Sequence, residues 1–127
     1  MFDLFRINNS AVCAPTIKQI VANTAVSYAV GDALVITSGK AAKCGATATP
    51  EYICAEKATG KSEISAYQVE NNQEYKTVLS TAGTLAIGSK VTLSDTSDSV
   101  TATTTSGVAE VISVAGTTSG SEVVVKF

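Results

Sequence analysis

The three cysteines, Cys13, Cys44 and Cys54, carry the most reactive side chains of this 127-residue chain. A cysteine nucleophile or a thiolate metal site normally needs a histidine partner or a second cysteine at C-x-x-C spacing. The chain has no histidine, and none of its cysteines has that spacing. We therefore expect three small, buried or half-buried thiols in a reducing compartment. A thiol-dependent activity at these positions is the enzymatic alternative.

The eleven carboxylates suggest no catalytic set either. Asp95 and Asp98, in "SDTSDS", could approach a calcium ion, but such a site needs six or more oxygen ligands, so a hydrophilic loop tip is favoured. The absence of histidine removes Ser-His-Asp triads. "GTLAIGSK" lacks the spacing of a phosphate-binding loop. We expect no enzymatic activity, no metal and no cofactor.

The charge balance narrows the choice of partners. The net charge is −2 and the pI is about 5.0, without the basic excess that nucleic-acid binding requires. The first ten residues, "MFDLFRINNS", lack the basic start and apolar core of a signal peptide. The most apolar stretch is interrupted by polar residues and falls short of a membrane span. We expect a protein made in the cytoplasm that binds neither nucleic acid nor membrane.

Abundant Val, Thr and Ser, with Gly-rich breaks at short intervals, predict an all-β domain over residues 26–127, either a small barrel or a sandwich. "SAYQVENNQEYKTVLS" favours a hairpin with its tip at Asn71 and Asn72. The expected strands are Ala33–Thr37, Glu51–Ala55, Ile64–Val69, Glu74–Leu79, Lys90–Ser94, Val108–Val114 and Glu122–Phe127.

One short pattern occurs three times, as "VGDALVI", "IGSKVTL" and "SGSEVVV". Each copy has Gly, then Asp or Ser, then a strand-forming run. Such residues form tight turns that admit a positive φ, so Gly31, Asp32, Gly88, Gly107 and Gly120 are predicted structural turns. Turn–strand units in tandem also favour an internal pseudo-repeat, against the alternative that β-proteins reuse turn chemistry by chance.

Residues 1–25 form a separate segment, which we predict to be an N-terminal arm or docking segment. A chain terminus frays unless it is tied down, and this one carries apolar residues. The candidate residues for docking to a partner or another subunit are Phe2, Leu4, Phe5, Arg6 and Ile7. The stretch that begins at Pro15 is either one or two helical turns, with three aliphatic residues on one side, or an extended arm.

From Tyr28 to Phe127 the chain resembles the small head decoration, or capsid cement, proteins of tailed bacteriophages. The stretches that carry the resemblance are "VGDALVITSGKAAKC" and "EYKTVLSTAGTLAIGSKVTLSDTSDSVTATTTSGVAEVISVAGTTSGSEVVVKF". The matching positions are scaffold residues in turns and strands: Gly31, Asp32, Gly88, Val91, Gly107, Val108, Ala109, Glu110, Gly120, Val123 and Val125. Residues 1–27 have no counterpart in this pattern.

The resemblance implies an SH3-like or β-tulip-like decoration fold and a structural role in the virion. Such a protein binds the exterior of the capsid and stabilises the shell by bridging subunits of the major capsid protein. It also implies a homo-oligomer, with a trimer preferred and a dimer as the alternative. The competing interpretation is a β-rich receptor- or carbohydrate-binding virion or fibre domain. Sugar binding usually needs exposed aromatic side chains, and the chain has no tryptophan and four tyrosines.

Overall fold

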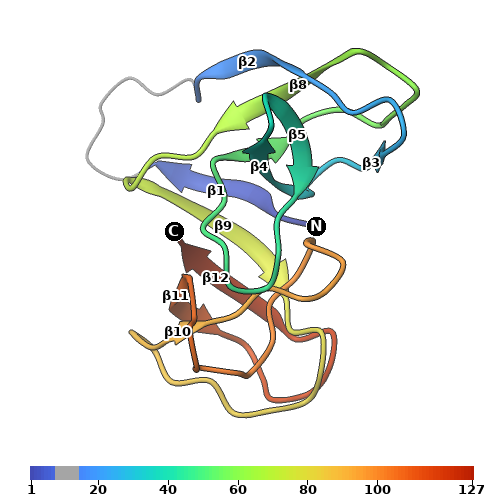
Figure 1. Cartoon of the computed structure of the whole chain (residues 1–127). Coiled ribbons are helices and arrows are strands. Elements are labelled where there is room, and N and C mark those ends of the chain that lie inside the picture. The colour runs from blue at the N-terminus through green and yellow to red at the C-terminus, as the bar shows by residue number, and fades with distance from the viewer. Residues whose placement is uncertain (8–14) are drawn as a thin grey trace.

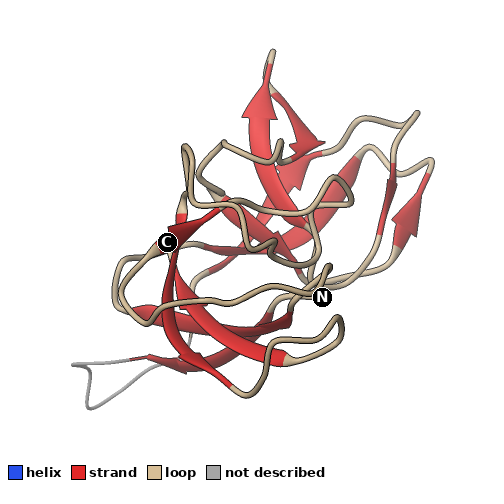
Figure 2. Ribbon diagram, turned by 90° about the horizontal axis from the view of Figure 1, so that it is seen from below, coloured by secondary structure: helices blue, strands red, loops and turns tan. Residues whose placement is uncertain are grey.

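The computed structural model describes residues 1–7 and 15–127 (Figure 1). Within these ranges the chain forms twelve strands and no helix (Figure 2), which confirms the all-β prediction. The sheets are antiparallel and not closed into a barrel, so the sandwich is the better description. The strands are β1 (Asp3–Ile7), β2 (Ile17–Val21), β3 (Ser27–Tyr28), β4 (Ala33–Thr37), β5 (Lys40–Lys43), β6 (Tyr52–Cys54), β7 (Ala58–Thr59), β8 (Glu63–Gln68), β9 (Gln73–Val78), β10 (Lys90–Val91), β11 (Ala109–Val114) and β12 (Glu122–Lys126).

The strands form two five-stranded sheets and one two-stranded sheet. Sheet A has the order β1-β9-β12-β11-β10, sheet B has the order β2-β8-β6-β4-β5, and β3 pairs with β7. In Figure 1 the strands of sheet B occupy the upper part of the molecule, and β9 to β12 of sheet A lie below them. Because β8 and β9 belong to different sheets, the hairpin predicted at Asn71 and Asn72 is wrong. That turn instead carries the chain from one sheet to the other.

The main core lies between the two sheets and contains an aromatic cluster. The rings of Phe2 and Phe127 have centroids 5.5 Å apart in an edge-to-face arrangement, and those of Tyr75 and Phe127 are 5.6 Å apart. Phe2 and Tyr75 are buried, among the aliphatic side chains of β10, β11 and β12. Edge-to-face and tilted contacts of this kind add to the stabilisation that burial of the rings provides.

Sheet B is buried on both faces at its centre. Ala33 and Ile53 face the main core, whereas their neighbours Leu34 and Cys54 face a second cluster. The small β3–β7 sheet contributes Tyr28 and Ala58 to this second cluster. A strand that is covered on both sides has no wet face, which explains why β4 has the sequence ALVIT instead of alternating polar and apolar residues.

The repeated Gly pattern forms the same turn three times. Gly31, Gly88 and Gly120 have φ angles of 84°, 83° and 87°. In each copy the residue after the glycine donates its N–H to the carbonyl three positions earlier, at 3.0–3.1 Å. This is the geometry of a type II turn, which needs a positive φ at its third residue. The strands β4, β10 and β12 begin one residue further on, so the pattern builds the scaffold. The larger pseudo-repeat stays a prediction.

Two of the predicted turn residues act through contacts instead of a positive φ. The buried carboxylate of Asp32 accepts a hydrogen bond from Ala29 N at 2.8 Å and pairs with Lys43 Nζ at 3.0 Å, which secures the first turn. At Gly107 an added Cβ would lie 2.2 Å from the carbonyl oxygen of Lys90. That position therefore needs glycine because the backbone of β10 passes directly beside it.

The N-terminal segment belongs to the folded domain wherever the structure describes it. β1 pairs with β9 at one edge of sheet A, and β2 pairs with β8 at one edge of sheet B. The helical alternative for the stretch after Pro15 is wrong, because Ile17–Val21 gains a full antiparallel ladder with β8 as an extended strand. Phe2 is 2% exposed and its N–H donates to Gly31 O at 3.0 Å. Residues 1–7 are therefore attached to the rest of the domain by strand pairing and by the burial of Phe2, and the assignment of residues 1–25 as an arm or docking segment stays a prediction.

Substitution of Phe2 by alanine should destabilise the fold strongly, because it empties a ring-sized volume in the main core. We expect a loss of about 3–5 kcal/mol in the free energy of unfolding, measured by urea titration. Phe5→Ala is the matched control, since Phe5 is 43% exposed, and should cost less than about 1 kcal/mol. Equal losses for the two variants would show that Phe2 is not a core residue.

Substitution of Gly107 by alanine should cost more than about 2 kcal/mol, because the new methyl group would overlap the backbone of β10. Gly45→Ala is the control, since a Cβ at Gly45 would meet no atom within 4 Å; its effect should stay within about 0.5 kcal/mol. Thermal unfolding of both variants measures the difference. An unchanged midpoint for Gly107→Ala would contradict the close approach.

Candidate functional site

The structure separates the five predicted docking residues. Phe2 is buried in the main core, and Leu4 packs against that core while partly buried. Ile7 is also partly buried. Of the five, only Phe5 and Arg6 are exposed, so they are the two that remain candidates for contact with a partner. Sequence reasoning treated all five alike because an apolar terminus does not reveal which side chains the sheet turns inward.

Phe5 is held outward by an irregularity in the β1–β9 ladder between Leu4 and Arg6. Its ring lies beneath two cations, with Lys76 Nζ 4.4 Å and Arg6 Cζ 5.2 Å from the ring centroid. Both distances fall in the range of cation–π attraction. Arg6 also forms an ion pair with Glu74 of β9. These contacts give an exposed aromatic side chain a defined orientation on the outer face of sheet A.

A shallow cavity of about 350 Å³ lies beside Phe5 on the same strands. Its wall combines apolar side chains, Met1 (50% exposed) and Val78 (39% exposed), with an ion pair in which Lys76 Nζ lies 3.3 Å from Glu122 Oε1. We call this surface, together with Phe5, the β1–β9 face. The residues that line the cavity are Met1, Asp3, Lys76, Thr77, Val78, Gly120 and Glu122.

The composition of the β1–β9 face suits a protein partner. It carries exposed apolar and aromatic side chains, and two of the charges beside them, Lys76 and Glu122, are paired with each other. Protein interfaces have this pattern, with aromatic and Met anchors in a polar surround. Four of its residues were not predicted from the sequence: Met1, Lys76, Val78 and Glu122. The alternation along β9 was a usable signal, because it puts Val78 on the wet side of a strand.

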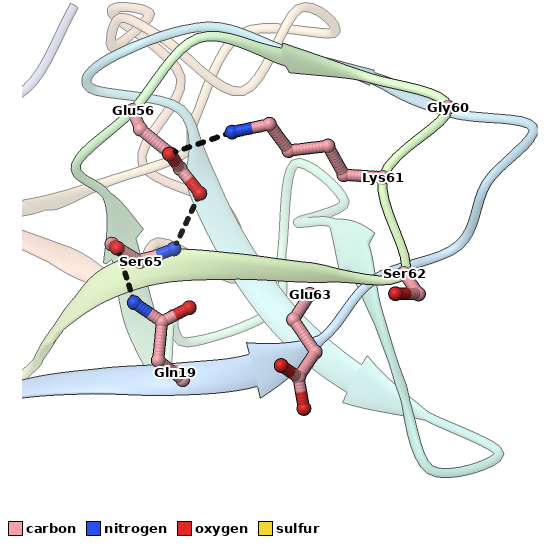
Figure 3. Close-up of a pocket in the computed structure, with 7 residues that line it drawn as sticks. All are labelled: Gln19, Glu56, Gly60, Lys61, Ser62, Glu63 and Ser65. Atoms are coloured by element: carbon pink, nitrogen blue, oxygen red, sulfur yellow. Dashed lines mark hydrogen bonds and ion pairs between the residues drawn. The ribbon is translucent and has the colours of Figure 1, made fainter.

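A second depression, of about 560 Å³, lies on sheet B beside β2 and β8 (Figure 3). Its polar groups bind one another. Glu56 accepts hydrogen bonds from Ser65 N at 2.9 Å and from Lys61 Nζ at 3.1 Å, which together lower the pKa of its carboxyl. Gln19 Nε2 donates to Ser65 Oγ at 2.6 Å. In Figure 3 the side chain of Glu63 points away from that of Glu56, so the two carboxylates of the depression do not converge on one point.

In the "SDTSDS" loop, the carboxylate of Asp98 is hydrogen-bonded to side chains of the same loop. Oδ1 of Asp98 accepts hydrogen bonds from the hydroxyls of Ser94 (3.2 Å), Thr96 (2.6 Å) and Ser99 (3.1 Å). Burial alone would raise the pKa of Asp98, but these hydrogen bonds and the positive charge of the N-terminus together outweigh burial, so the pKa is lowered. Asp95 is exposed. Among the described residues, no group of three or more histidine, cysteine or acidic side chains is arranged to hold a metal ion.

The two described cysteines are buried and bonded. Sγ of Cys44 donates to Ala48 O at 2.9 Å, and Sγ of Cys54 donates to Glu56 O at 3.0 Å. Burial raises the pKa of Cys44 to about 11, with a further contribution from Glu51, and burial also raises the pKa of Cys54. Thiolates are therefore scarce at neutral pH. Cys13 lies outside the described residues.

Comparisons of the chain with protein-family models, with curated proteins and with solved structures find no match. Within residues 1–7 and 15–127, no helix is long and apolar enough to cross a membrane.

Alkylation should distinguish structural thiols from reactive ones. We expect Cys44 and Cys54 to resist iodoacetamide at pH 8 in the folded protein, because their raised pKa values and burial keep them protonated and covered. Both should be modified after unfolding in urea, as peptide mass spectrometry can measure. Rapid labelling of either residue in the folded state would restore the thiol-dependent alternative.

Proposed function

We propose that this protein is a structural component of a bacteriophage virion that binds the outer surface of the capsid. It stabilises the shell by bridging subunits of the major capsid protein. Two lines of reasoning support the proposal: the resemblance from Tyr28 to Phe127, and the β1–β9 face. The single observation that carries it is Phe5, an exposed aromatic side chain on the edge strand β1, whose ring is contacted by Lys76 and Arg6.

The burial of Phe2 at the start of β1 makes the β1–β9 face suitable for docking. Phe2 fixes the start of β1 in the core, while Phe5, three residues later, stays exposed. A partner that binds Phe5 therefore contacts an edge already ordered before binding. A preorganised surface loses less conformational entropy on association, so more of the contact free energy appears as affinity.

A decoration protein acts by mass action. Any protein that binds the assembled shell better than its separated subunits stabilises the shell by its binding free energy at each occupied site. At a free concentration about 100 times Kd, each site contributes about 2.7 kcal/mol. Many copies on one shell add up to a large resistance to internal pressure, although each contact is modest.

The polar depression on sheet B supports a second candidate function, that of a receptor- or carbohydrate-binding virion domain. Its amide, hydroxyl and charged groups could bond to a sugar. No tyrosine lines the depression, however: Tyr28 and Tyr75 are buried, and Tyr52 and Tyr67 are partly buried. A sugar would have no aromatic face to stack on, so capsid binding remains the preferred function. A glycan array with the purified protein separates the two.

The test is to mix purified protein with undecorated mature shells and to heat them. We expect saturable binding to the outer surface and a higher temperature of genome release. The paired substitution Phe5→Ser with Val78→Ser should weaken binding at least about tenfold, as expected for loss of central apolar anchors.

Ile87→Ser is the matched control for this experiment. Ile87 is 71% exposed, the highest value among the large apolar side chains in residues 1–7 and 15–127, and it is not part of the β1–β9 face. Its substitution should leave binding unchanged. Failure of the unmodified protein to bind shells, or binding without a change in shell stability, would refute the proposed function. Equal effects of the two sets of substitutions would refute the role of the β1–β9 face.

A further inference from the structure

The charged side chains that line the cavity of the β1–β9 face can be placed from the register of the strands. Asp3 of β1 lies opposite Lys76 of β9, and Val78 of β9 lies opposite Glu122 of β12. Residues directly opposite each other, and residues two apart along a strand, point to the same face of a sheet. All four side chains therefore project from the outer face of sheet A, around the cavity that they line.

The ammonium group of Lys76 is turned away from its cross-strand neighbour Asp3. Its Nζ lies 3.3 Å from Glu122 Oε1 and 4.4 Å from the centroid of the Phe5 ring. In the part of the chain that the structure describes, Asp3 takes part in no ion pair. The carboxylate of Asp3 is exposed, so it faces solvent at the cavity without a counter-charge.

The nearby cations, Arg6 and the terminal ammonium of Met1, already have acidic neighbours. Arg6 forms its ion pair with Glu74. The ammonium of Met1 donates to the carbonyl oxygen of Asp98 and interacts with the carboxylate of the same residue. Among the described residues, Asp3 therefore gives the β1–β9 face one unbalanced negative charge.

We propose that this cavity binds an arginine side chain of the partner, with the guanidinium on the carboxylate of Asp3. The inference rests on the proposed function for the identity of the partner, and it names the group of that partner that enters the cavity. A guanidinium can bind a carboxylate through two N–H groups at once and is more weakly hydrated than an ammonium group. The aliphatic stem of the arginine would lie against Met1 and Val78, the apolar part of the wall.

The other classes of guest fit the cavity less well. An acidic group would meet the charges of Asp3 and Glu122, whereas the one lysine of the wall, Lys76, is already engaged by Glu122 and by the Phe5 ring. A neutral apolar group would cover the carboxylate of Asp3 without giving it a partner, which costs free energy. The cavity has room for a side chain beside Gly120, where an added Cβ would meet no atom within 4 Å.

The first experiment uses the isolated protein and a blocked amino acid, N-acetyl-argininamide, in a titration followed by NMR. We expect saturable shifts of the backbone amides of Asp3, Val78 and Gly120. The Kd should be about 1–10 mM, because one exposed ion pair contributes little affinity. N-acetyl-citrullinamide has nearly the same shape without the charge and should cause no such shifts. N-acetyl-glutamate tests for a site that selects acids.

Three variants test the roles of the charges in this titration. Asp3→Asn removes the unbalanced charge and should weaken binding of N-acetyl-argininamide about threefold. Lys76→Gln should strengthen binding, because it removes the competing cation and releases Glu122. Glu63→Gln is the matched control, since it removes an exposed carboxylate from sheet B, and it should change nothing. The dispersion of the amide spectrum confirms that each variant is folded.

The second experiment measures binding of the same variants to undecorated mature shells. Asp3→Asn should weaken binding about threefold or more, and Asp3→Lys should weaken it at least about tenfold, because it sets a base against the guanidinium of the partner. Glu63→Gln should bind like the unmodified protein.

The inference would be overturned if N-acetyl-argininamide caused no saturable shifts, if N-acetyl-glutamate bound more tightly, or if Asp3→Asn and Glu63→Gln behaved alike. Shell binding that Asp3→Asn leaves unchanged would also overturn it, since the arginine of the partner would then lie elsewhere. Binding of N-acetyl-argininamide at Asp3 without any binding to shells would refute the proposed function and support an arginine site for a different partner. The two experiments therefore distinguish failure of the inference from failure of the proposed function.

Discussion

The burial of Phe2 against Phe127 and near Tyr75 is the contact on which the rest of the arrangement depends. It joins the first residues of the chain to its last and to the middle of β9. The N–H of Phe2 also bonds to Gly31, at the turn that leads into β4 of the other sheet. Phe2 thus fixes the edge of sheet A and the orientation of β1 through its side chain, and contacts the turn before β4 through its backbone N–H. The outward position of Phe5 follows from this anchor together with the irregularity next to it.

Burial of sheet B on both faces has a consequence for function. The chain is moderately apolar, and most of its aliphatic side chains fill the two clusters. Among the described residues, seven large apolar side chains remain exposed, and three of them lie on edge strands: Phe5 on β1, and Ile17 and Val21 on β2. The candidate contact surface at Phe5 lies on such an edge because edges are where a sandwich leaves backbone and side-chain surface unpaired.

The strands that sequence reasoning found are those with long apolar or alternating runs between Gly turns. All seven expected strands are present, and Ala33–Thr37 has the predicted bounds. The overlooked strands lack a sequence signal of their own. β5 has the sequence KAAK, β3 and β7 contain two residues each, and β2 combines aliphatic residues at a spacing that a helix would also permit. Their conformation is decided by a partner strand far along the chain, which local propensity cannot reveal.

The candidate site was predictable only in part, because it too is formed by strands that are far apart in the sequence. The sequence indicated that the N-terminal residues are candidates for docking. That Phe2 is buried whereas Phe5 is exposed depends on the pairing of β1 with β9. Lys76 and Glu122 become neighbours only because β9 and β12 are adjacent. The glycine turns, in contrast, were predictable from three or four residues, because a positive φ is a local requirement.

Cryo-electron microscopy of undecorated mature shells incubated with the purified protein would show whether and how the protein binds a capsid. We expect added density on the outer surface, into which the structure fits with the β1–β9 face against the shell and with Phe5 and Val78 in contact with the major capsid protein. Density in which that face points to solvent, or shells without added density, would contradict it.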